Sequence, residues 1–132
     1  MGMYTGLRGS VTFKQGISEL VNEWWNNDED EDMWVYVAQR VNYYTPKFKE
    51  FTRDRRPSHI PFGAVCYMPD DWSNIAKSIL DGNELYFTCS LKNYTGTIQK
   101  FIECLPEIAD AWDLESRYEE AESGTFYKKE IE

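Results

Sequence analysis

Residues 84–91, with the sequence ELYFTCSL, alternate between strongly apolar and other side chains over the length of a short strand. The apolar positions are Leu85, Phe87, Cys89 and Leu91, and the positions between them are Tyr86, Thr88 and Ser90. A period of two residues places successive side chains on opposite faces of a β-strand. The stretch therefore predicts a strand with one buried face and one partly open face.

The chain that follows this strand predicts a helix and then further strands. From Thr97 an apolar stripe recurs at helical spacing and consists of Ile98, Phe101, Ile102, Leu105 and Ile108. Pro106 lies within this stripe, so we expect a kink or a break there. Residues 114–119 alternate again and predict the last main strand, and residues 125–128 suit a short edge strand.

The N-terminal part of the chain predicts a strand and then a helix. Residues 7–13 alternate between apolar and polar side chains, as a strand with one buried face does. After Gly16 the apolar residues recur at helical spacing and comprise Ile17, Leu20, Val21, Trp24 and Trp25. We expect this helix to end near residues 26–27 and five consecutive acids, residues 28–32, to form a solvated loop that leads toward the next helix.

The segment that follows predicts two short helices and a loop. Residues 33–42 fit the spacing of a helix and the composition of a strand, and we choose a helix. Thr45 is a suitable N-cap for a helix over residues 46–53 that begins with proline. Two prolines in residues 57–63 predict a loop.

The remaining central segment predicts a strand, a helix and a turn. Residues 64–68 are a short apolar run of the kind found in strands. Asp70 or Asp71 can cap a helix over residues 72–80. Residues 81–83, Asp-Gly-Asn, predict a turn before the strand at residues 84–91.

This order of elements predicts an α+β fold of the ferredoxin-like, split βαβ type. We expect an antiparallel four-stranded sheet with helices on one face. The chain should form a single domain over residues 1–132, in which residues 27–62 are an acidic loop and a helical insertion after the first helix.

The amino-acid composition indicates the cellular compartment and the class of partner that we expect. The 132 residues carry 14 basic and 23 acidic side chains, a formal net charge of −9, with 42% hydrophobic and 16% aromatic residues. This charge repels nucleic acid and anionic membrane surfaces and favours a basic protein partner. Cys66, Cys89 and Cys104 form no CxxC pair, so we expect buried free thiols in a reducing cytoplasm. No apolar run approaches the length of a membrane span.

The sequence predicts no enzyme and no cofactor. His59 is the one histidine of the chain, so nucleophilic triads and histidine-rich metal sites lack partners, and we expect a structural histidine. Asp70 and Asp71 could bind a divalent ion, but capping of a helix explains them more simply. We expect no metal site.

Acidic side chains are the candidate partner-binding residues. They are Asp28, Glu29, Asp30, Glu31, Asp32, Glu119, Glu120 and Glu122. From residue 103 to residue 132 there are three bases and ten acids, and 3 − 10 gives −7. A solvated surface explains this local excess of negative charge most simply. The functional alternative is an anionic surface that binds a basic partner.

Three stretches resemble small uncharacterised proteins of tailed bacteriophages and prophages. The stretches are IPFGAVCYMPDDW (60–72), LYFTCSLKNYTGTIQKFIECLP (85–106) and LESRYEEAESGTFY (114–127), together with a YTGLR start at residues 4–8. The C-terminal half also resembles a ferredoxin-like domain of other phage-associated proteins. The resemblance brings no catalytic motif with it.

These observations lead to one main hypothesis and two alternatives. The main hypothesis is a non-enzymatic phage accessory protein in the bacterial host cytoplasm that binds a basic host protein. Its concrete version inhibits a nucleic-acid-handling defence system, of anti-CRISPR or anti-restriction type, through the acidic surface. The first alternative is a small-ligand or nucleotide-binding module that uses Tyr86, Arg117 and Tyr118 on the open sheet face. The second is a structural homodimer.

Overall fold

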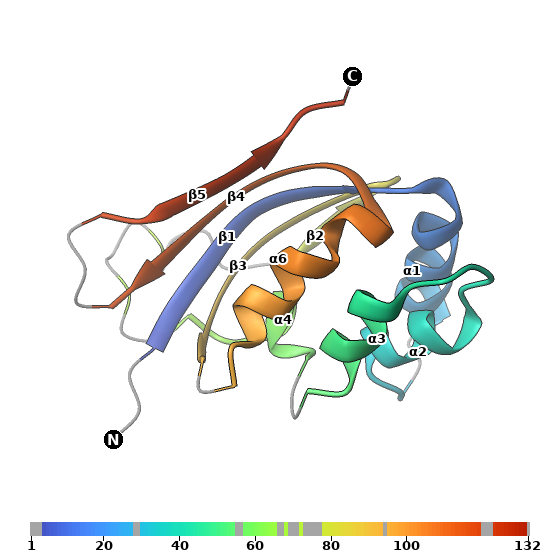
Figure 1. Cartoon of the computed structure of the whole chain (residues 1–132), viewed down its shortest axis with the longest axis horizontal. Helices are drawn as coiled ribbons and strands as arrows, with labels where there is room; N and C mark the ends of the chain where they lie inside the picture. The colour runs from blue at the N-terminus through green and yellow to red at the C-terminus, as the bar shows by residue number, and fades with distance from the viewer. Residues whose placement is uncertain are drawn as a thin grey trace.

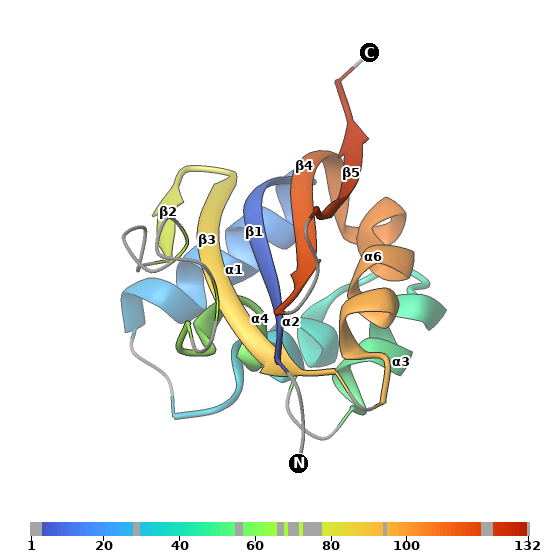
Figure 2. The same ribbon diagram turned by 90° about the vertical axis from the view of Figure 1, so that its left-hand side faces the viewer.

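The structure is a computed structural model that describes residues 4–27, 30–54, 57–65, 68, 72, 78–93, 95–119 and 123–131. Within these residues the strands form one antiparallel sheet in the order β2-β3-β1-β4-β5 (Figures 1 and 2). The strands are β1 (Tyr4–Phe13), β2 (Ile79–Asp81), β3 (Glu84–Lys92), β4 (Ala109–Tyr118) and β5 (Thr125–Lys129). The predicted α+β class is confirmed, but the sheet has five strands rather than four because β5 pairs with β4.

The register of the central strand β1 defines two faces of the sheet. Val11 lies opposite Leu85 on β3 and Trp112 on β4, and this face carries the buried side chains. Ser10, the preceding residue, lies opposite Tyr86 and Asp113 on the other face. We call the first the inner face and the second the outer face.

The helices cover the inner face of the sheet (Figures 1 and 2). They are α1 (Gln15–Asn27), α2 (Met33–Arg40), α3 (Pro46–Thr52), α4 (His59–Phe62) and α6 (Thr97–Ile108). The stripes predicted after Gly16 and from Thr97 form α1 and α6. Helix α6 continues through Pro106 to Ile108, so the break expected at this proline is not seen. Pro106 lies in the last turn, where it removes one backbone donor close to the point at which the helix ends.

The helical segment between residues 27 and 62 supplies the centre of the hydrophobic core. The Trp34 ring is fully buried, and its centroid lies 5.7–6.0 Å from those of Phe13, Phe48, Phe51 and Phe101. Its indole N–H donates a hydrogen bond to the carbonyl of Ile60. The segment predicted as an insertion therefore packs into the same core as the sheet, rather than beside it.

Capping explains why the two short helices begin where they do. The Asp32 carboxylate accepts hydrogen bonds from the backbone N–H groups of Trp34 and Val35, so the last of the five acids is the N-cap of α2. The choice of a helix for residues 33–42 is confirmed over 33–40.

Thr45 precedes α3 as predicted, but its side chain makes no capping hydrogen bond. Glu107 of α6 accepts from Lys47 N and Phe48 N instead, at 3.1 and 2.8 Å.

Two predictions for the central segment are wrong. Residues 57–63 contain the short helix α4, with a cis peptide bond between Ile60 and Pro61, rather than a loop alone. Ile79 and Leu80 belong to β2 rather than to a helix, because Gly82, at φ +61°, makes a tight turn that returns the chain to β3.

The predicted strand at residues 64–68 is not seen in its described part. Ala64, Val65 and Met68 are in no strand, and the Ala64 carbonyl accepts a hydrogen bond from the side chain of Ser90. Cys66, Tyr67, Asp70, Asp71 and residues 73–77 lie outside the described residues.

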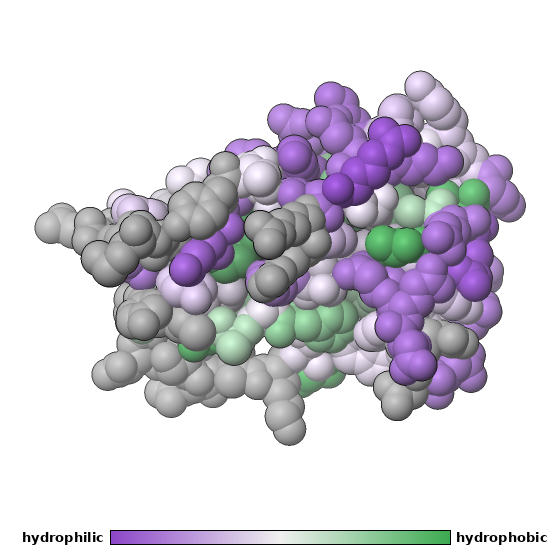
Figure 3. Space-filling model, turned by 90° about the horizontal axis from the view of Figure 1, so that it is seen from below, coloured by the Kyte–Doolittle hydropathy of each residue, from purple (hydrophilic) through white to green (hydrophobic). Residues whose placement is uncertain are grey.

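The surface seen from below Figure 1 is mixed in character. In Figure 3 the coloured part of this face is mostly hydrophilic, with small hydrophobic areas between the polar side chains. Among the described residues, no helix combines the length and the apolarity that crossing a membrane requires. The outer face of the sheet offers a more distinctive surface.

Candidate ligand-binding site

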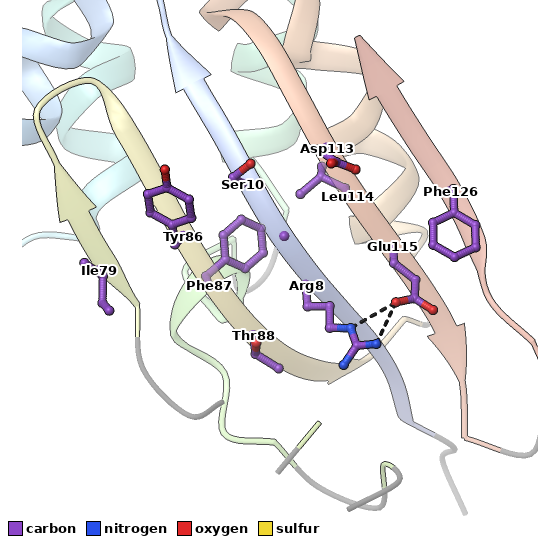
Figure 4. A pocket seen from close by; sticks show the side chains of 11 residues that line it. Arg8, Ser10, Ile79, Tyr86, Phe87, Thr88, Asp113, Leu114, Glu115 and Phe126 are labelled. Atoms are coloured by element: carbon purple, nitrogen blue, oxygen red, sulfur yellow. Dashed lines mark hydrogen bonds and ion pairs between the residues drawn. The ribbon is translucent and has the colours of Figure 1, made fainter. Parts of the chain in front are cut away.

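A depression of about 400 Å³ crosses the outer face of the sheet (Figure 4). We call it the outer trough, and its main lining side chains are Arg8, Ser10, Ile79, Tyr86, Asp113, Glu115 and Phe126. These residues come from all five strands, so the trough exists only when the whole sheet is assembled. Its volume lies in the range of pockets that hold small molecules.

Small residues on the central strand make this face hollow. On its outer face β1 carries Gly6, Arg8, Ser10 and Thr12, of which only Arg8 is long. At Gly6 the space is taken, because a β-carbon there would lie 2.7 Å from side-chain atoms of both Met68 and Trp72. Both are buried, so the Gly6 end of the outer face is covered and the Ser10 end is open.

Strand register arranges the lining side chains in two rows across the strands. The first row reads Ile79, Tyr86, Ser10 and Asp113 from β2 to β4, and Lys128 of β5, opposite Asp113, lies beyond the lining. The second reads Thr88, Arg8, Glu115 and Phe126 from β3 to β5. Figure 4 shows the short Ser10 side chain between Tyr86 and Asp113. Ser10 therefore forms the floor of the trough.

Arg8 forms one end of the trough, and its charge is already balanced. Its Nε and Nη2 atoms both lie 2.9 Å from Glu115 Oε1, and both side chains are mostly buried. The guanidinium carbon also lies 4.1 Å from the centroid of the Trp72 ring, a cation–π arrangement. Arg8 is thus held by Glu115 and Trp72 and adds no free positive charge to the trough.

Apolar side chains form the rims of the trough and are exposed. The exposed fractions are 42% for Tyr86, 58% for Ile79 and 71% for Phe126. The Tyr86 hydroxyl donates a hydrogen bond to the Glu84 carboxylate, which raises the pKa of Tyr86 above its ordinary value. A tyrosine hydroxyl is already protonated at neutral pH, so Tyr86 adds no charge to the trough.

Asp113 carries the free charge of the trough. Within the described residues its carboxylate has neither an ion pair nor a hydrogen bond, and the residue is exposed. Lys128 lies opposite on β5, but its Nζ is 3.4 Å from Glu130. With Arg8 balanced by Glu115, the open part of the trough has an acidic character.

The structure separates the three residues predicted for the open sheet face. Tyr86 lines the outer trough. Arg117 is on the same face but opposite Gly6, at the covered end. Tyr118 lies opposite Thr5, so its position in the strand belongs to the inner face. Neighbouring residues of one strand cannot share a face, and this alternation already placed Arg117 and Tyr118 apart.

The remaining lining residues were missed because they depend on strand register. Arg8, Ser10, Asp113 and Phe126 come together only when β1, β4 and β5 are aligned, and one sequence does not give that alignment. The available signal was the run of small residues on the polar face of the first strand.

The predicted acidic residues do not come together in the described part of the chain. Asp28, Glu29, Glu120 and Glu122 lie outside the described residues. Asp30 is exposed, Glu31 lies 3.8 Å from Arg40, and Asp32 caps α2. Glu119 directly follows β4, and its backbone N–H donates to the carbonyl of Tyr4. In Figure 1 the start of α2 and the end of β4 lie at opposite ends of the molecule.

Two cysteines are buried in the core. Cys89 and Cys104 are free thiols, as predicted, and Cys66 lies outside the described residues. Burial raises the pKa of both thiols well above the ordinary value. They belong to the core and not to the outer trough.

Comparison with known proteins identifies no relative. The chain matches no protein family, and neither a curated protein nor a solved structure shows significant similarity to it. The function is therefore inferred from the geometry of the outer trough.

Proposed function

We propose that the protein is a non-catalytic binding protein whose binding site is the outer trough. The main support for this proposal is an open depression of about 400 Å³ on the outer face of the sheet, with exposed apolar side chains at its rims. Binding sites typically combine apolar walls with a few placed polar groups. Here the rims are apolar, and Ser10 and Asp113 supply the polar groups.

The arrangement of strands supports a specific architecture for this module. We propose a split βαβ sheet extended by one strand, because β3 lies beside β1, and α6 connects β3 to β4 on the far side of β1. The face of the sheet away from the helices carries the depression (Figure 4). The partial cover from Met68 and Trp72 narrows that face to the outer trough.

A role as a phage accessory protein in the host cytoplasm is a second proposal. The net charge of −9 supports it, because an acidic protein favours a basic partner. Inhibition of a nucleic-acid-handling defence system is its concrete version. Because the start of α2 and the end of β4 lie at opposite ends of the molecule (Figure 1), such a partner would contact the acids beside one of them at a time or span the molecule's length.

Filling the outer trough tests the primary proposal. The variant Ser10→Trp places a large side chain on the floor of the trough, and the open face gives it room. A library of small apolar and aromatic compounds is screened against the ¹⁵N-labelled protein by two-dimensional NMR. We expect the amide signals that shift to cluster on residues of the outer trough, and Ser10→Trp to weaken those compounds at least about tenfold.

A control variant distinguishes blocking of the outer trough from a general effect of adding a tryptophan side chain. Gln39 is exposed on α2, so Gln39→Trp adds the same side chain away from the trough and should leave binding unchanged. Circular dichroism confirms that both variants fold. Shifts that cluster on the helical side, or equal binding by wild type and Ser10→Trp, would refute the proposal.

A further inference from the structure

We propose that the outer trough selects a small organic cation, that is, an ammonium or guanidinium group on a compact apolar body. This inference rests on the proposed function of the trough and adds the chemical class of its ligand. The subsite for the charge is the row Tyr86, Ser10 and Asp113.

The balance of charge in the trough decides the sign of the ligand. Among the described lining residues Arg8 is the one positive side chain, and it is held by Glu115 at 2.9 Å and stacks on Trp72. The Asp113 carboxylate has no such partner within the described residues. An anion such as a phosphate would therefore meet an unpaired carboxylate, whereas a cation would pair with it.

The spacing of the strands gives the charge a place between two attractive groups. Tyr86 and Asp113 are on the two strands that flank β1, so their backbones lie about 10 Å apart, twice the usual strand separation. Ser10 between them is too short to fill this gap. A cation above Ser10 can face the Tyr86 ring on one side and Asp113 on the other, and aromatic rings attract cations within about 6 Å of their centroid.

The rest of the trough suits a compact apolar body. Ile79 continues the same row beyond Tyr86, and Phe126 lies in the neighbouring row beside Glu115. The Arg8, Glu115 and Trp72 group closes one end of the depression. A volume of about 400 Å³ with one closed end favours a small molecule over an extended polypeptide.

Three probes of one shape test the sign of the charge. They are 2-phenylethylamine, the neutral 2-phenylethanol and the anion 3-phenylpropionate, each titrated into ¹⁵N-labelled protein. We expect the amine to shift amide signals of the trough and to bind at least about tenfold more tightly than the alcohol, with the anion weakest. Asp113→Asn should remove the preference for the amine over the alcohol.

Asp110→Asn is the matched control for this substitution. It removes the same charge from the same strand at an exposed residue that does not line the trough. The amine preference should survive in Asp110→Asn. If both aspartate variants lower the affinity for the amine equally, the amine responds to the net charge of the protein rather than to Asp113, and the inference is overturned.

The remaining outcomes distinguish the inference from the proposed function. Equal binding of amine and alcohol in the trough would overturn the charge selectivity and leave the trough as a binding site. Failure of all three probes to shift any signal of the trough at millimolar concentration would overturn both. Binding of N-acetyl-Phe-Lys-amide at least about tenfold tighter than 2-phenylethylamine would replace the small cation by a basic side chain of a polypeptide.

Discussion

Gly9 is the residue on which the close approach of β1 to β4 depends. Its φ of +137° is a conformation that residues with a side chain rarely adopt, and a β-carbon there would lie 2.0 Å from the carbonyl oxygen of Asp113. A side chain at Gly9 would therefore be disfavoured twice, by backbone strain and by the clash with Asp113. The backbone of β4 cannot move away to relieve the clash, because this would break its hydrogen bonds with β1. Gly9 therefore fixes the sheet directly beneath the outer trough.

We predict that Gly9→Ala lowers the free energy of unfolding by at least about 2 kcal/mol, because strained backbone alone costs about 1–3 kcal/mol. Chemical denaturation measures the change. Gly16→Ala is the control, since a β-carbon at Gly16 meets nothing within 4 Å and alanine favours the helix. Gly16→Ala should be neutral or stabilising, and a similar loss in both variants would contradict the argument.

Cys89 and Cys104 are positioned to be chemically inert in the native protein. Both are buried, and their raised pKa values keep them as neutral thiols, whereas the thiolate is the reactive form. We predict that brief treatment of native protein with a maleimide at pH 8 modifies neither cysteine. Peptide mass spectrometry, which identifies each site separately, provides the measurement, and the protein unfolded in denaturant is the positive control.

The same raised pKa values predict how stability depends on pH. Because the native pKa lies above that of the unfolded chain, where an ordinary thiol has a pKa of 9.0, the neutral thiols favour the folded state below that pH. The free energy of unfolding should decrease as the pH rises above about 9, once thiols of the unfolded chain ionise. Cys89→Ala and Cys104→Ala should each make this decrease less steep.

At the scale of secondary structure, Glu107 joins two helices far apart in the sequence. Its carboxylate accepts hydrogen bonds from Lys47 N and Phe48 N, two of the backbone donors that the first turn of α3 leaves without helical partners. Thr45, the predicted cap, makes no capping hydrogen bond. The N-terminus of α3 is thus held by α6 rather than by its own sequence.

We predict that Glu107→Ala destabilises the protein by about 1–2 kcal/mol, the usual cost of losing a helix cap. The matched control is Glu103→Ala on the same helix. Glu103 lies 4.0 Å from Lys47 with both side chains more than half exposed, and such pairs contribute little. Equal losses in the two variants, measured by thermal and chemical unfolding, would show that Glu107 does not act as a cap.

Elements with a strong local pattern were predictable, and those fixed by tertiary contacts were not. The alternation over residues 84–91 and the stripe from Thr97 gave β3 and α6, because burial of one face determines each pattern. Ile79 and Leu80 carry no alternation of their own and become a strand through the turn at Gly82. The outer trough was less predictable still, since only Tyr86 of its lining was identified and the others depend on register across several strands.

At the scale of the whole molecule, the excess negative charge is divided between separate regions. The chain carries 23 acids and 14 bases. The described acids of one group, Asp30 to Asp32, directly precede α2, and Glu119 of the other directly follows β4. The start of α2 and the end of β4 lie at opposite ends of the molecule (Figure 1). Charges farther apart than a Debye length of about 10 Å at 0.1 M salt interact weakly. The two groups should therefore act on stability independently.

A double-mutant cycle measures this independence. One variant carries Asp28→Asn, Glu29→Gln and Asp30→Asn, which leaves the Asp32 cap intact, and the other carries Glu120→Gln and Glu122→Gln. We predict that each variant is slightly more stable than wild type at low ionic strength, because neutralisation relieves self-repulsion, and that added salt removes the gain. The combined variant should show the sum of the two changes in the free energy of unfolding within about 0.5 kcal/mol. A coupling well above that value would place the two groups on one acidic surface, so that a single basic partner could contact both at once.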